Sequence, residues 1–203
     1  MITVFHYVDL GGQNMSQAKS NTRILTETAI MSALSIVLSY IIVFRMPQGG
    51  SVSLVLLPLI FISLRRGPVW DCLAGAICGI VQLMFGGSFL NPIQVLFDYV
   101  LSFGTLGFSG FFARPFQAAV TNKKQSKIFL YTFLASLLGG FMAYVNNVIS
   151  GIVFYGEYTP KGQSVFAYST IYNATYMISE TIVALIIIWL LAARTPKLFL
   201  PER

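Results

Sequence analysis

The sequence predicts an all-α integral membrane protein with six transmembrane helices and both termini in the cytoplasm. Of its 203 residues, 56% are hydrophobic and only 10% are charged, whereas a soluble domain usually has about 25% charged residues. The apolar residues also form long blocks that short polar segments separate. A soluble globule of this length could not bury so much apolar surface, and a disordered chain would be far less hydrophobic.

Six apolar blocks are candidates for helices that cross the membrane, which takes about 20 residues each. The predicted spans are 22–44, 51–64, 69–85, 92–113, 128–155 and 165–193. The second is short and the fifth is long, which indicates tilting or a segment that crosses only part of the bilayer. We expect a polar connection over 114–127, one six-helix domain over 19–203, and a poorly ordered extension over 1–18.

The basic residues predict the orientation of the chain. With the N-terminus inside, eleven of the 13 Lys and Arg residues fall on the cytoplasmic side and two on the outer side, as the positive-inside rule requires. The inner residues are Lys19, Arg23, Arg65, Arg66, Arg114, Lys123, Lys124, Lys127, Arg194, Lys197 and Arg203, and the outer ones are Arg45 and Lys161. The net charge of +6 therefore indicates topology, and no nucleic-acid partner is expected.

Polar side chains within the spans are candidates for a binding site, because such groups are costly in a membrane and often functional. Asp98, Asn146, Asn147 and Asn173 each lie about seven or eight residues from the outer end of a span, at a depth of roughly 10 Å. Five tyrosines accompany them, namely Tyr99, Tyr144, Tyr155, Tyr168 and Tyr172. These groups predict a pocket that is open to the outside and suits an organic cation, through ion pairing and cation–π attraction.

The spacing of these residues is compatible with two interpretations. Spacing of i, i+4 places residues on one helical stripe, and it relates Ser169 to Asn173 in the sixth span. In the fifth span it relates Ala143, Asn147, Gly151 and Tyr155. The alternative is that Asn and Tyr only form hydrogen bonds between helices, and the residues alone leave both open.

Other features favour a binding or transport protein over an enzyme. The sequence has no Walker A loop, no Gly-x-Ser-x-Gly motif and a single histidine, His6, so neither a catalytic residue nor a metal or cofactor is expected. Glu180 lies near the middle of the membrane, where we favour a structural role over protonation or a proton relay. Ala29 and Ala33 form a small-xxx-small pair on the first helix, which is compatible with docking to a second membrane protein.

Several segments resemble one transporter family, from about residue 22 to the end of the chain. The segments are PQGGS (47–51), LP (57–58), SLRRG (63–67), PIQVLFDY (92–99), SGIVFYG (150–156) and YSTIYNA (168–174). They resemble the thiamine-specific substrate-binding component, or S-component, of energy-coupling factor (ECF) transporters, the ThiT family. The resemblance implies a six-helix, multi-pass protein in the plasma membrane of a bacterium, which binds thiamine or a related cationic vitamin from outside.

The resemblance also implies partners. In this family the S-component has no ATPase of its own and docks on an ECF transmembrane subunit that carries two ECF ATPases. The small residues of its first helix face that subunit, and they correspond to Ala29 and Ala33 in this sequence.

The resemblance further implies which residues bind the ligand. They are Asp98 and Tyr99 in the fourth span, Asn147, Gly151 and Tyr155 in the fifth, and Tyr168, Ser169 and Asn173 in the sixth. The acid would lie near the cationic or amino-bearing part of the vitamin, the tyrosines would enclose its rings, and the Asn and Asp side chains would contact the aminopyrimidine edge.

This sequence departs from the family at three positions. It has Asn147 where His is common, Ala143 where a basic residue is common, and Gly49 where some members have Trp. The alternatives are therefore an S-component for a thiamine precursor or another vitamin, such as a hydroxymethylpyrimidine or a pyridoxine-like ligand, and a standalone proton-coupled transporter that uses Glu180.

Overall fold

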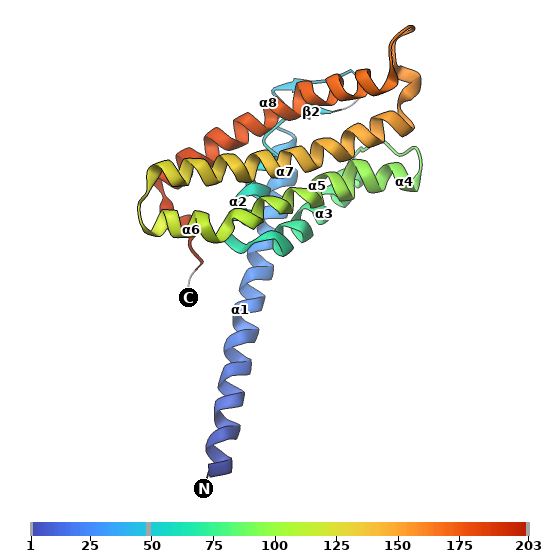
Figure 1. Ribbon diagram of the computed structural model, residues 1–203. Coiled ribbons are helices and arrows are strands. Elements are labelled where there is room, and N and C mark those ends of the chain that lie inside the picture. The colour runs from blue at the N-terminus through green and yellow to red at the C-terminus, as the bar shows by residue number, and fades with distance from the viewer. Residues whose placement is uncertain (1, 48–49, 202–203) are drawn as a thin grey trace.

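The computed structural model describes residues 2–47 and 50–201, with side chains described from residue 21 onward. Within these residues the protein is mostly helical, and the long helices α7 (Gln125–Phe154) and α8 (Val165–Arg194) pack along each other (Figure 1). The side chains of the expected extension over 1–18 lie outside the described part. The division of the chain into 1–18 and 19–203 therefore stays a prediction.

A segmented helix from Pro92 to Thr121 packs against α7. It begins sharply, because the Asn91 side chain accepts hydrogen bonds from the backbone N–H groups of Ile93 and Gln94 and proline follows at the first helical position. Its winding then changes along its length. The successive parts are α4 (Pro92–Val95), the π-helical η1 (Leu96–Leu101), α5 (Ser102–Gly104), the 3₁₀-helical η2 (Thr105–Phe112) and α6 (Ala113–Thr121).

The remaining elements pack against these helices or connect them. They are α1 (Ile2–Ser39), β1 (Phe44–Arg45), β2 (Ser51–Val52), α2 (Leu56–Arg66), α3 (Pro68–Met84), η3 (Gly156–Tyr158) and η4 (Pro196–Phe199). Helix α2 is the most buried of them, since Leu59, Ile60, Ile62 and Leu64 are fully buried. It lies in contact with α1, α3 and α8, so its apolar side chains form the centre of the protein.

Four described helices are long and apolar enough to cross a membrane. They are Asn21–Ser39 of α1, the segmented helix Pro92–Thr121, α7 and α8. Helix α3 has 17 residues and α2 has only 11. At 1.5 Å per residue, the length of α2 is about half the thickness of a 30 Å hydrocarbon core. The predicted helical membrane protein is confirmed, while the count of six spans stays a prediction.

The first two predicted spans are wrong at their ends. Helix α1 ends at Ser39, and β1 and β2 then form a short antiparallel hairpin in which Phe44 lies opposite Val52. Gly50 adopts a φ of 79° between the strands, and its carbonyl accepts a hydrogen bond from the Met46 N–H (3.0 Å). The second helix therefore begins only at Leu56.

The polar connection predicted over 114–127 is also wrong, because helix α6 continues to Thr121. Ala113, Phe116 and Val120 are buried at helical spacing, while Arg114 is exposed. This amphipathic pattern allows a polar stretch to stay helical. The chain turns only afterwards, at Lys123, whose φ is 53°.

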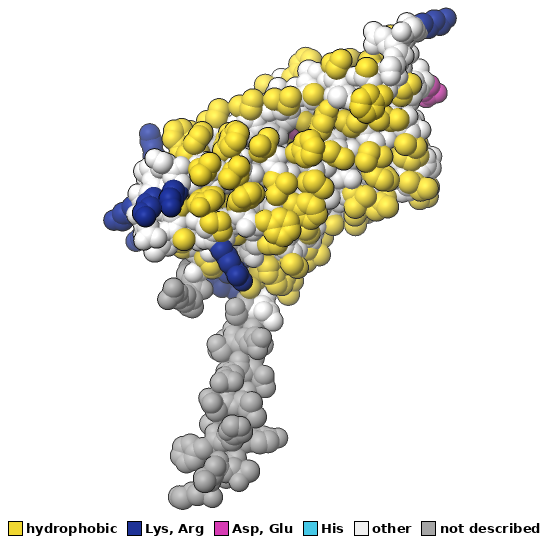
Figure 2. Space-filling view, in the orientation of Figure 1, with side chains coloured by type: hydrophobic (Ala, Val, Ile, Leu, Met, Phe, Trp, Pro, Cys, Tyr) yellow, Lys and Arg dark blue, Asp and Glu magenta, His cyan; other side chains and the backbone are white. Residues whose placement is uncertain are grey.

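Hydrophobic side chains cover the visible face of the helical bundle, and most of the visible Lys and Arg side chains gather at one end (Figure 2). We call this the basic end. Its residues include Lys123 and Lys124 between α6 and α7, Lys127 in the first turn of α7, Arg194 at the end of α8, Lys197 in η4, and Arg65 and Arg66 at the end of α2. The opposite ends of α7 and α8 carry Tyr155 and Tyr168. The apolar middle and the single strongly basic end are typical of a membrane protein.

Glycines allow the helices to approach closely. A Cβ atom on Gly79 of α3 would overlap the backbone carbonyl of Tyr99, and one on Gly75 would overlap that of Phe103. The small-residue pair of the third predicted span therefore packs against the segmented helix, as such pairs do in membranes. This contact sets the position of the π-helical stretch that carries Asp98 and Tyr99.

Candidate ligand-binding site

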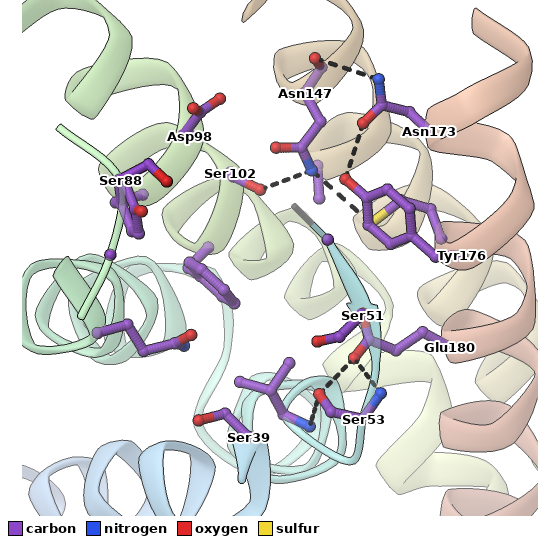
Figure 3. A pocket seen from close by; sticks show the side chains of 18 of the residues that line it. Ser39, Ser51, Ser53, Ser88, Asp98, Ser102, Asn147, Asn173, Tyr176 and Glu180 are labelled. Atoms are coloured by element: carbon purple, nitrogen blue, oxygen red, sulfur yellow. Dashed lines mark hydrogen bonds between the residues drawn. The ribbon is translucent and has the colours of Figure 1, made fainter. Parts of the chain in front are cut away.

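A cavity of about 350 Å³ lies between the hairpin, α3, the segmented helix, α7 and α8 (Figure 3). Small-molecule sites usually enclose about 300–1,000 Å³. All eight residues predicted to bind the ligand line this cavity, although they come from different helices and from the end of α7. They are Asp98, Tyr99, Asn147, Gly151, Tyr155, Tyr168, Ser169 and Asn173.

Asp98 is held by hydrogen bonds to one of its two carboxylate oxygens. The Gln94 side-chain amide and the Tyr155 hydroxyl (3.0 Å) both donate to Oδ2. No hydrogen bond from a described residue reaches Oδ1. Asp98 lies in η1, and π-helical stretches often occur at functional sites. The carboxylate is thus fixed by one oxygen and can accept a ligand donor with the other.

Gln94 is a residue of this site that the sequence reasoning missed. Its side chain is fully buried and contacts both Asp98 and Tyr155. Its i, i+4 spacing from Asp98 in the segment PIQVLFDY is the signal that could have identified it.

Tyr155 lies just beyond the end of α7. Burial, and then the neighbouring Asp98 carboxylate, raises the pKa of its phenol above the usual value. Like an ordinary phenol it is protonated at neutral pH, and its hydroxyl donates to Asp98 Oδ2.

Asn147 presents an acceptor to the cavity. Its Nδ2 donates to Ser102 Oγ (3.0 Å) and contacts Met177 Sδ (3.7 Å). No described side chain donates to its Oδ1. The amide is therefore oriented by the segmented helix and α8, with its oxygen left for a ligand.

Asn173 has the opposite arrangement, because both ends of its amide are used within the protein. Its Oδ1 accepts from the Tyr176 hydroxyl (2.7 Å), and its Nδ2 donates to the Ser169 carbonyl (2.9 Å). Gly151 and Ser169 are in contact where α7 meets α8, since a Cβ on Gly151 would overlap Ser169 Oγ. These three residues line the cavity. They also hold α7 and α8 together, because Ser169 Oγ donates to the Val148 carbonyl (3.0 Å) and Asn173 Nδ2 donates to the Asn147 carbonyl (3.4 Å).

Two residues expected in the pocket do not line it. Asn146 donates to the Met142 carbonyl (2.9 Å) and Thr105 Oγ1 (3.0 Å), and Tyr144 donates to the Thr170 carbonyl (3.1 Å). They form the hydrogen bonds between and within helices that were the alternative interpretation. A similar depth did bring Asp98, Asn147 and Asn173 to one cavity. Depth does not separate Asn146 from Asn147, however. Neighbouring residues on a helix point about 100° apart, so these two cannot both face the cavity.

Tyrosine rings form much of the cavity wall. The ring centroids of Tyr168 and Tyr172 lie 5.7 Å apart, and those of Tyr155 and Tyr158 lie 6.1 Å apart. All four residues line the cavity. Such rings offer flat apolar faces and favour cations above them.

The charged residues that line the cavity are two acids and one base, Asp98, Glu180 and Arg45. Arg45 lies in β1 and is exposed, whereas Glu180 is buried. Glu180 was expected deeper than the pocket, yet the cavity extends to it along α8. In so confined a site, the free oxygen of Asp98 favours a positively charged ligand.

The three departures from the family have different outcomes. Asn147 and Ala143 both line the cavity, so they change its chemistry directly. Gly49 lies outside the described residues.

The chain is similar to known proteins over most of its length. The family model described as "Thiamine transporter protein" matches residues 25–200. The thiamine transporter ThiT of Bacillus subtilis is 37% identical over 192 residues, which cover 93% of this chain and 100% of that protein. ThiT of Lacticaseibacillus paracasei is 33% identical over 188 residues, covering 88% and 91%.

A solved structure, ThiT from Listeria monocytogenes, is similar with a TM-score of 0.84 at 30% identity, covering 89% of this chain and 99% of that one. The resemblance seen in the sequence is thereby confirmed. So is the predicted class, a binding or transport protein rather than an enzyme, because these relatives are named as transporters.

Proposed function

The chain belongs to the thiamine transporter protein family, and we propose that it binds thiamine from outside the cell and delivers it to an ATP-driven ECF importer. The observation that carries this proposal is that eight predicted residues from separate parts of the chain line one cavity. Thiamine joins a cationic thiazolium ring to an aminopyrimidine ring, so it needs hydrogen-bond acceptors, aromatic faces and negative charge.

The residues of the cavity meet these needs in different ways. The free oxygens of Asp98 and Asn147 accept hydrogen bonds from the amino-bearing edge of the vitamin, and Asp98 also offsets its charge. Tyr99 and the four tyrosines of the wall enclose its rings. Gly151, Ser169 and Asn173 hold α7 and α8 at the spacing that the cavity requires.

The proposed orientation places the cavity on the outer side of a bacterial plasma membrane. The basic end would face the cytoplasm according to the positive-inside rule, and the cavity lies toward the other ends of α7 and α8. Six membrane segments and cytoplasmic termini are part of this proposal, with α2 and α3 as its two short segments.

The proposed partners are the ECF transmembrane subunit and its two ATPases. Ala29 and Ala33 are exposed on α1, and the neighbouring Ile30, Leu34 and Val37 are exposed as well. Small and apolar residues on one exposed helix suit close packing against another membrane helix.

Asp98→Asn tests the binding site. It removes the negative charge but keeps the shape, and we expect a loss of thiamine affinity on the order of 2–5 kcal/mol by titration calorimetry. The matched control is Glu157→Gln, which removes an exposed acid outside the cavity and should bind as the unmodified protein does. Unchanged affinity in Asp98→Asn would remove Asp98 from the site.

A second candidate ligand is a thiamine precursor or another vitamin. Ala143 and Asn147, which replace larger or basic side chains of the family, favour it because both line the cavity. Thermal unfolding with thiamine, a hydroxymethylpyrimidine and pyridoxine separates the candidates, since only a bound ligand raises the melting temperature with its concentration.

Delivery to the importer is tested by uptake into vesicles. Thiamine should accumulate only when the ECF subunits and ATP are present. Accumulation by the chain alone, driven by a pH gradient, would instead support the standalone proton-coupled transporter.

A further inference from the structure

Glu180 is a buried carboxylate that the proposed thiamine contacts do not use. Its side chain is only 4% exposed in the middle of α8, and Ser53, which follows β2, is 3% exposed. The Ser53 N–H (3.0 Å) and the Ser53 hydroxyl (2.7 Å) both donate to Glu180 Oε1 (Figure 3). One carboxylate oxygen thus joins α8 to the segment between the hairpin and α2.

We propose that Glu180 is a positioning residue, which clamps residues 51–53 to α8 and so keeps the cavity closed on its hairpin side. Both Ser53 donors reach the same carboxyl oxygen, so two hydrogen bonds hold this contact. Burying a carboxylate is costly unless it is paired, and no salt bridge to Glu180 occurs within the described side chains. The two hydrogen bonds from Ser53 offset the cost of burying this carboxyl group.

A second contact holds the hairpin to the same helix one turn away. Gly50, at a φ of 79°, lies against the Tyr176 ring, and a Cβ at this position would come within 2.7 Å of Tyr176 Cε1. The Tyr176 hydroxyl in turn donates to Asn173 Oδ1. The hairpin segment therefore rests on two successive turns of α8, next to a residue of the proposed thiamine site.

The same clamp also orders the start of α2. Ser53 Oγ accepts a hydrogen bond from the Val55 N–H (3.3 Å) while it donates to Glu180. Gly50, Ser51 and Ser53 all line the cavity, so they form its wall on this side. When the clamp is broken, this wall loses its attachment and a bound ligand escapes faster.

The decisive test compares Glu180→Gln with Glu180→Ala. A glutamine oxygen can still accept from both Ser53 groups, whereas alanine cannot. We expect hydrogen exchange at the Ser53 amide, measured without ligand, and thiamine dissociation to become at least about tenfold faster in Glu180→Ala. Both should stay within about threefold of the unmodified protein in Glu180→Gln. Ser179→Ala, an exposed change on the same helix, is the control.

Ser53→Ala is a second variant in case Glu180→Ala does not fold. It removes the hydroxyl donor and keeps the N–H, so exchange and dissociation should rise less than in Glu180→Ala. Unchanged exchange at residue 53 in both alanine variants would overturn the clamp. Equal weakening of binding in Glu180→Gln and Glu180→Ala would overturn it too, and would assign Glu180 to direct charge contact with the ligand.

The ligand readout rests on the proposed function, but the exchange readout does not. If the unmodified protein does not bind thiamine, the proposed function fails, while hydrogen exchange at residue 53 still decides whether Glu180 holds the hairpin.

Discussion

The basic end and the cavity both contain carboxylates, but the two regions satisfy them differently. At the basic end, both oxygens of Glu27 accept hydrogen bonds from Arg65 and Arg66, at 2.7–3.1 Å. In the cavity, the described residues donate to only one oxygen of Asp98 and to only one of Glu180. A saturated acid stabilises a fold, and an acid with a free oxygen is able to bind something else.

The hydrogen bonds at the basic end also connect distant parts of the chain. Arg65 donates to the carbonyls of Leu198 and Leu200 (2.6 and 2.7 Å) in addition to Glu27. One network therefore joins α1, α2 and the C-terminal segment. Because both oxygens of its carboxylate are occupied by arginine donors, we assign this network to stability and the cavity to binding.

The largest effect on stability is expected from Glu27→Gln. The change leaves two arginines, whose side chains are only 8% and 11% exposed, without their negative partner. We expect the free energy of unfolding to fall by about 2 kcal/mol, measured by thermal or chemical unfolding in detergent, with thiamine affinity unchanged. Lys124→Gln, an exposed change at the same end, should alter neither quantity. A loss of affinity in Glu27→Gln at constant stability would break the division between the two regions.

A smaller loss of stability is expected from a change in packing beside the cavity. Gly151→Ala would place a methyl group on Ser169 Oγ, and we expect it to destabilise the protein by about 1–2 kcal/mol. Adding Ser169→Ala removes the overlapping hydroxyl, so the double variant should regain part of the lost stability in an unfolding cycle. Strict additivity of the two changes would show that α7 and α8 do not meet closely at this point.

The sequence predicts the regular half of this molecule well. Residues 143, 147 and 151 are one turn apart on α7, and Tyr155 follows just beyond its end, so periodicity correctly placed them on one stripe. In the structure this stripe faces the cavity. A similar depth in the membrane added Asp98 and Tyr99 from a different helix, and the family pattern then named both as ligand contacts. Long helices with constant winding translate spacing directly into a shared face.

The irregular half could not be predicted in the same way. The pairing of Phe44 with Val52 depends on contacts of the hairpin with α8. Strands of two residues are too short for a local sequence pattern to predict them. The π-helical turn at Asp98 alters the angular position of every later residue. Glu180 was placed by depth alone, which does not show that the cavity reaches it.

The smallest predicted effect concerns the donor that orients Asp98. Tyr155→Phe removes the hydroxyl that donates to Asp98 Oδ2 but keeps the ring, so we expect thiamine affinity to fall by about 1 kcal/mol. Tyr158→Phe is the matched control, because Tyr158 lines the same cavity and its hydroxyl makes no hydrogen bond to a described residue. Calorimetry should show weaker binding only in the first variant. Equal losses of thiamine affinity in both variants would mean that the two hydroxyls contact the ligand themselves. The Tyr155 hydroxyl would then not be needed to hold Asp98 in place.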